Sequence, residues 1–185
     1  MIKLMDNNLK TTIEMKINEG DINALIKFSN KDKKKFDKCL REYQSLYLEN
    51  AIAQYNLDMA KYLYGYIGFI PLKNEIVKKL IINAIFNKNE EIIIWILCIY
   101  HDNIDQESGN DLFHEICIAG LFDAAIEFYK LLKIKFDENK IKVITDKKIT
   151  DWIFEKAREA GLKNICKIII KMRVDGVEDM MKKIK

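Results

Sequence analysis

The stretch that decides the fold is Gly120-Leu121-Phe122-Asp123-Ala124-Ala125-Ile126, because related phrases recur along the chain. Each copy has an acidic or amide residue at its centre and an apolar residue directly after it. The centres are spaced by 35, 33, 32 and 41 residues. A period of this size is typical of repeat proteins, so we expect a repeat architecture. The four other copies are 19–25, 55–61, 88–94 and 161–167.

The apolar spacing around each phrase predicts helices. In Ile76 to Ile85, and again in Ile92 to Leu97, apolar residues return every three or four positions, which is the helical period. Only one proline and seven glycines are present, too few for the many turns of an all-β fold. We therefore predict an all-α chain in which each phrase joins two helices, with joints near residues 20, 55, 88, 120 and 161.

Each joint has a physical logic. Gly20, Gly120 and Gly161 can adopt the left-handed backbone that ends a first helix, and the central polar residue favours the positive amino end of the second helix. Tyr55 and Lys88 replace the glycine in two copies. There we expect either a small strain or the use of the neighbouring asparagine.

Apolar residues after the joints predict the core. The position after each central residue and the position four residues later are apolar in all five copies, so both lie on one face of the second helix. We expect these residues to be buried: Ala24, Met59, Ile92, Ala124, Ile165, Phe28, Leu63, Ile96, Phe128 and Ile169.

The phrases resemble degenerate ankyrin repeats. The resemblance rests on 20–27 and 56–63, which match the second half of that family's repeat, and covers roughly residues 10 to 176. The family's opening motif survives only as Ile70-Pro71-Leu72. The resemblance implies a single domain over 1–185, an α-solenoid of about five stacked helix-turn-helix repeats with shortened or missing β-hairpins, and a capping tail at 177–185.

Two connectors depart from the repeat. The segment Lys31 to Tyr47 is predicted to extend the first helix of the second repeat. The interval before Thr150 is the longest, so an insertion of about eight residues is expected to project within 135–150. Thr150-Asp151 is predicted to begin the next helix.

Composition limits the classes of function. The net charge is +3, from 31 basic and 28 acidic residues, which does not indicate steering toward nucleic acid. The four cysteines lack CxxC spacing, and no leader or long apolar run is evident. We expect an intracellular, cytoplasmic protein without a membrane segment; a secreted effector acting in a host cytoplasm stays open.

Candidate chemical sites are few. His114 and Cys117 lie three residues apart, a spacing compatible with two metal ligands or an activated thiolate, but no second pair accompanies them. We interpret them as a surface histidine beside a core cysteine. Lysine runs such as 31–35 are interrupted by acids, and arginine is scarce, so solvated charge is favoured over nucleic-acid binding. Trp95 and Trp152 are expected to pack in the core.

The resemblance to ankyrin repeats implies a non-enzymatic protein–protein interaction module without cofactor or metal. Exposed residues at the starts of first helices and in connectors are then the natural contacts with another protein. The heavy use of Ile, Lys and Asn resembles ankyrin-like proteins of large DNA viruses and AT-rich intracellular bacteria. A structural subunit and a nucleic-acid-binding or metal-dependent protein stay as alternatives. The predicted contacts are Tyr43, Tyr47, Lys73, Asn74, Asn110, Asp111, His114, Lys147 and Lys148.

Overall fold

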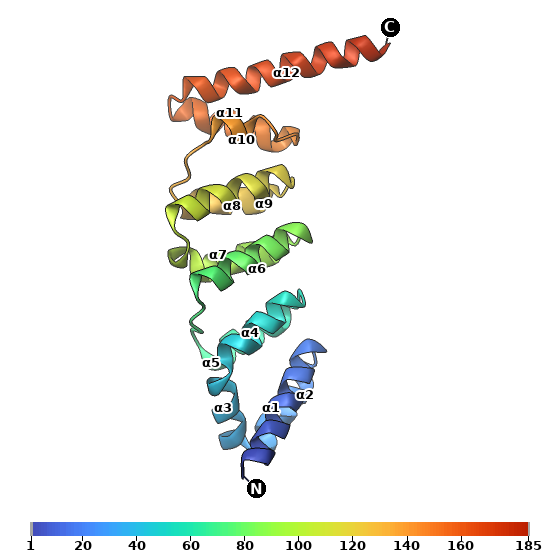
Figure 1. The fold of residues 1–185 in the computed structure, drawn as a ribbon, viewed down its shortest axis with the longest axis vertical. Helices are drawn as coiled ribbons and strands as arrows, with labels where there is room; N and C mark the ends of the chain where they lie inside the picture. Colours follow the sequence, from blue (N-terminus) through green and yellow to red (C-terminus); the bar gives the residue numbers. More distant parts are fainter. Residues whose placement is uncertain (1, 185) are drawn as a thin grey trace. The chain divides into compact units, whose positions relative to one another are not determined.

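The computed structural model describes residues 2–184, with side chains described over 8–174. Helices account for nearly all regular structure, and no strand occurs in the described residues (Figure 1). The prediction of an all-α chain is confirmed over these residues. None of the helices searched in this range is long and apolar enough to cross a membrane.

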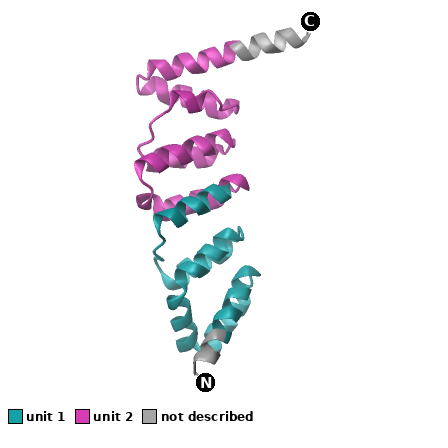
Figure 2. Cartoon of the chain, viewed as in Figure 1, with its two compact units in different colours: residues 1–84 teal, residues 85–185 magenta. Residues whose placement is uncertain are grey.

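The chain divides into two compact units, Met1–Ala84 and Ile85–Lys185 (Figure 2). The first contains α1 (Ile2–Asn18), α2 (Ile22–Lys31), α3 (Lys33–Glu42), α4 (Gln44–Ala53), α5 (Leu57–Ile67) and most of α6 (Asn74–Phe86). The second contains the end of α6, α7 (Glu90–Tyr100), a 3₁₀ turn (His101–Asn103), α8 (Gln106–Ile118), α9 (Phe122–Leu131), α10 (Glu138–Ile141), α11 (Lys147–Glu159) and α12 (Lys163–Ile184).

All five predicted joints lie between consecutive helices. Gly20, Gly120 and Gly161 have φ angles of 71°, 79° and 70°, the left-handed backbone expected of them. Tyr55 and Lys88 take the same conformation, with φ of 56° and 53°. Of the two outcomes left open, the substituted residue itself therefore takes the left-handed backbone, which costs an L-residue about 1–2 kcal/mol.

The central acidic residues Asp58, Glu91 and Asp123 lie in the first helical turn, at the positive amino end as predicted, and a different residue caps the helix in three of the joints. Asp21, Asn56 and Asn89 directly follow the left-handed residue, and their side chains accept hydrogen bonds from the third residue of the helix at 3.0, 2.9 and 3.1 Å. The central residue of the phrase instead lies in the first helical turn. An asparagine there is thus a cap, not a substitute for glycine.

One joint is capped from the preceding repeat. The N-cap position of α9 is Leu121, whose side chain cannot accept a hydrogen bond. The carboxylate of Glu90, in the first turn of α7, accepts bonds from the backbone N–H groups of Asp123 and Ala124 at 2.8 and 3.0 Å. The Glu90 carboxylate therefore caps α9, as the Asn56 side chain caps α5.

The predicted core positions are buried in four of the five repeats. Met59, Leu63, Ile96 and Phe128 have no exposed surface, and Ile92, Ala124, Ile165 and Ile169 are at most 4% exposed. In the first repeat Ala24 and Phe28 are only half-buried, and Leu25 is the buried residue of α2. The core face of α2 is thus rotated by about one residue from the prediction.

Two connector predictions are wrong. Most of the segment 31–47 forms a separate helix, α3, and α4 begins only at Gln44. Asp32 ends α2 and caps α3, accepting from the Lys35 N–H at 3.2 Å. The first helix of the last repeat, α11, begins at Lys147 rather than at Thr150. Its N-cap is Asp146, whose side chain accepts from the Ile149 N–H at 2.9 Å. The predicted tail 177–185 belongs to α12 up to Ile184, and its side chains lie outside the described residues.

Candidate functional site

Helix α8 carries a row of polar side chains that organises the candidate site. Asp105 begins the helix by accepting from the Ser108 N–H at 2.9 Å and from its hydroxyl at 2.7 Å. Gln106, Asn110 and His114 follow at intervals of four residues. Residues at this spacing lie on one face of a helix, one turn above another.

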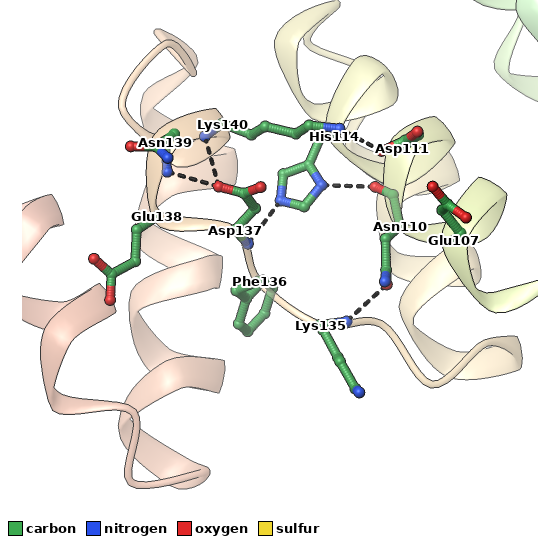
Figure 3. Close-up of a pocket in the computed structure, with 10 residues that line it drawn as sticks. All are labelled: Glu107, Asn110, Asp111, His114, Lys135, Phe136, Asp137, Glu138, Asn139 and Lys140. Atoms are coloured by element: carbon green, nitrogen blue, oxygen red, sulfur yellow. Dashed lines mark hydrogen bonds and ion pairs between the residues drawn. The ribbon is translucent and has the colours of Figure 1, made fainter.

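That row binds the connector between α9 and α11, residues 132–146. Gln106 Nε2 donates to the carbonyl of residue 133 at 2.6 Å, and Asn110 Oδ1 accepts from the N–H of residue 135 at 2.9 Å. His114 Nε2 accepts from the N–H of residue 137 at 3.2 Å. Each step of four residues on α8 is therefore matched by a step of two residues in the connector, and Figure 3 shows the step from Asn110 to His114.

The match has a geometric cause. Four residues of an α-helix rise by about 6 Å, and two residues of extended chain span about 6.5 Å. A straight stretch of connector can therefore present alternate backbone groups to successive turns of α8. The predicted insertion does not project into solvent; it is docked, and side chains of α8 satisfy its backbone polar groups.

Phe136 anchors the connector on the other side. Its ring stacks on Tyr129 of α9, with centroids 5.6 Å apart and planes 10° from parallel, and lies 5.9 Å from Phe113 of α8. Trp152 of α11 meets Tyr129 edge-on at 5.3 Å. Trp152 thus packs in this aromatic cluster, although it is half-buried rather than part of the fully buried core.

His114 is fully buried, although it was expected on the surface. Its Nδ1 lies 2.6 Å from the Asn110 carbonyl, so this nitrogen must carry a proton, and its Nε2 accepts a hydrogen bond. Burial lowers the pKa of His114 below its usual range; the Asn110 carbonyl opposes this, and the positive Lys140 adds to it. The ring is therefore held neutral in one tautomer.

A polar cavity of about 530 Å³ opens between α8 and the connector. Figure 3 shows Glu107 and Glu138 on opposite sides of it, with His114 between. Lys140 Nζ forms an ion pair with Asp111 across the cavity. Four carboxylates and two lysines line it, so its net charge is −2 with a neutral histidine. The lining residues are Glu107, Asn110, Asp111, His114, Lys135, Phe136, Asp137, Glu138, Asn139 and Lys140.

Three of the nine predicted contact residues, Asn110, Asp111 and His114, meet at this cavity. Asn110 and His114 are used to hold the connector, and His114 is not available to a partner because it is buried. Sequence reasoning missed Gln106 and the connector residues. The spacing of Gln106, Asn110 and His114 was a usable signal, because residues four positions apart form a row of polar side chains along one face of the helix.

The other predicted residues lie elsewhere. Tyr47 is fully buried, contrary to the expectation that it is exposed; burial raises the pKa of its hydroxyl, which donates to the Lys10 carbonyl at 3.4 Å. Tyr43 is half-buried under the Lys10 ammonium. Lys73 and Asn74 are exposed at the start of α6.

The remaining pair opens α11. Lys147 and Lys148 are both exposed in its first turn. Lys147 lines a second cavity, of about 490 Å³, between this helix start and α12. The Lys148 ammonium lies 3.9 Å from the centre of the Phe122 ring.

Cys117 does not have the properties of a nucleophile. It is fully buried, and burial raises its pKa to about 12, so the thiol stays protonated at neutral pH. Its neighbour in the sequence pattern, His114, uses both ring nitrogens in other bonds. Over the described part of the chain, no group of three or more His, Cys, Asp or Glu side chains is placed to hold a metal ion.

Comparison with known proteins identified no relative of this chain. No family model, no curated protein and no solved structure matches this chain. The resemblance to ankyrin repeats therefore stays a prediction based on the residues quoted above.

Proposed function

We propose that this chain is a non-enzymatic protein-binding module that holds a basic, polar segment of another protein in the cavity between α8 and the connector. One observation carries the proposal: Glu107 and Glu138 are exposed on opposite sides of a concave site whose other carboxylates, on Asp111 and Asp137, have partners. Concave sites of this size, between about 300 and 1,000 Å³, suit a few side chains of a ligand.

The charge of the cavity favours a cationic partner over nucleic acid. Its net charge of −2 repels phosphate, while two carboxylates can receive lysine or arginine side chains by charge-assisted hydrogen bonds. The buried, neutral His114 and the protonated Cys117 support a binding role rather than catalysis.

Selection from a displayed library of random short peptides tests the proposal. Wild-type protein is expected to enrich peptides rich in Lys and Arg, with binding that weakens as salt rises. The double variant Glu107→Gln/Glu138→Gln should lose this enrichment, since glutamine keeps the shape and removes the charge. Enrichment of acidic peptides, or enrichment of basic peptides by the double variant, would refute the proposed binding site.

A matched control has the same change of charge elsewhere in the same unit. Glu91 and Glu115 are exposed glutamates on α7 and α8 that do not line the cavity. Glu91→Gln/Glu115→Gln should keep the wild-type selection. An equal loss in both double variants would show that net charge, and not the cavity, attracts the peptides.

A second function, a subunit of a larger assembly, is favoured by one residue. Phe86, near the end of α6, is 82% exposed, an unusual state for so large an apolar side chain. If it mediates assembly, sedimentation velocity at rising concentration should show self-association that Phe86→Ser removes. A monomer at all concentrations excludes self-association and leaves the peptide-binding proposal unaffected.

A further inference from the structure

We propose that the connector is an acid-operated closure: it docks on α8 while His114 is neutral and is released when His114 Nε2 is protonated. This device is independent of the identity of any partner. It follows from the way in which both ring nitrogens are used.

The proton positions on His114 are dictated by its neighbours. Nδ1 faces a carbonyl oxygen at 2.6 Å, so it must donate. Nε2 faces the backbone N–H of Asp137 at 3.2 Å, so it must accept through its lone pair. A second proton would occupy that lone pair and place two N–H donors against each other. The docked connector therefore has no place for an imidazolium.

The charged groups around the ring do not create such a place. From the connector and α10, the groups that line the same cavity are Lys135, Asp137, Glu138 and Lys140, and from α8 they are Glu107 and Asp111. Asp111 is paired with Lys140, and the Asp137 carboxylate accepts from the N–H groups of residues 139 and 140. The nearest acids thus already have partners, and complete burial of the ring opposes a charge.

The sign of the effect follows from linkage. With the connector open, His114 is solvated and has an ordinary pKa near 6.5. With it closed, burial lowers the pKa of His114, so the open state binds the proton more tightly. The equilibrium constant for closing is therefore largest above about pH 6.5. Each pH unit below that lowers it by up to tenfold, until the pKa of His114 in the closed state is reached.

Opening would remove the candidate cavity. Six of its ten lining residues, 135–140, belong to the connector. The Phe136 ring would leave Tyr129 and Phe113, and Phe113, which is fully buried, would become accessible. Acid would thus replace a polar cavity with an exposed aromatic surface.

Hydrogen exchange by mass spectrometry between pH 7.5 and 5.0, corrected for intrinsic rates, tests the proposal on the intact chain. Protection of residues 133–141 is expected to be constant above pH 6.5 and to fall by up to tenfold per unit below it. Protection within α7 should not change over this range. His101→Gln, a change at the other histidine, should behave as wild type.

One substitution and one NMR titration test the role of His114 directly. His114→Gln removes the titrating group, so protection of 133–141 should become independent of pH. Because that variant could fail to fold, the wild-type His114 ring should also be titrated by ¹⁵N NMR. A neutral Nδ1–H tautomer with a pKa below 6.5 is expected. A pKa at or above 6.5, or protection that does not change with pH, would overturn the proposal.

Discussion

Gly20 offers the sharpest test of how the joints are built. Its φ of 71° strains any L-residue, and a Cβ built there would lie 2.2 Å from Nδ2 of Asn56. Asn56 cannot simply move aside, because its Oδ1 caps α5 through the N–H of Met59 at 2.9 Å. Gly20→Ala is therefore expected to damage two consecutive joints at once.

The magnitude can be worked out in parts. A left-handed alanine costs about 1–2 kcal/mol, and the loss of glycine's freedom in the unfolded chain returns about 0.4–1 kcal/mol. Displacing the Asn56 side chain sacrifices an N-cap worth about 1 kcal/mol. Gly20→Ala should thus lower the free energy of unfolding by about 2 kcal/mol, of which about half comes from Asn56.

A double-mutant cycle in urea separates the two parts. In an Asn56→Ala background the cap is already lost and the short side chain leaves room, so Gly20→Ala should cost only about 1 kcal/mol. Gly161→Ala is a control for the backbone cost alone, because at φ 70° a Cβ there would meet nothing within 4 Å. If Gly20→Ala costs the same in both backgrounds, the predicted clash between the joints is refuted.

Two substitutions and one labelling experiment test other features. Lys88→Gly should raise the free energy of unfolding by about 0.5–1 kcal/mol, because Lys88 is exposed at φ 53°; urea denaturation measures it, and a loss of stability would contradict the strain. Glu90→Ala should cost about 1 kcal/mol through the start of α9, seen as faster amide exchange at residues 123 and 124; unchanged exchange would exclude this cap. At pH 8, iodoacetamide should label exposed Cys98 well before Cys117, by peptide mass spectrometry; equal rates would contradict the raised pKa.

The helices and joints could be predicted because their signals are local. A glycine before a capping residue and an apolar spacing of three or four residues are properties of a few consecutive positions. The joint at Lys88 was also found, although its glycine is missing, because the surrounding pattern is intact. The sequence left two outcomes open at this joint, strain at Lys88 or use of Asn89, because the difference between them depends on small energies.

The connector and the site could not be predicted in the same way. Whether 132–146 projects or docks depends on the pairing of Gln106, Asn110 and His114 with backbone groups 23 to 27 residues away. His114 was placed on the surface because a polar residue on a helix usually lies in solvent. The exception arises from a partner that only the tertiary structure supplies.

The contact of Glu90 with α9 couples the stability of two consecutive helix pairs. A fragment beginning at residue 105 would contain both helices of the α8–α9 pair but would leave the amino end of α9 without its carboxylate. The stability of the α8–α9 pair therefore depends on a residue of the repeat before it. Divisions of this chain for expression, or grafts of one repeat into another scaffold, have to carry α7 along with the pair that follows it.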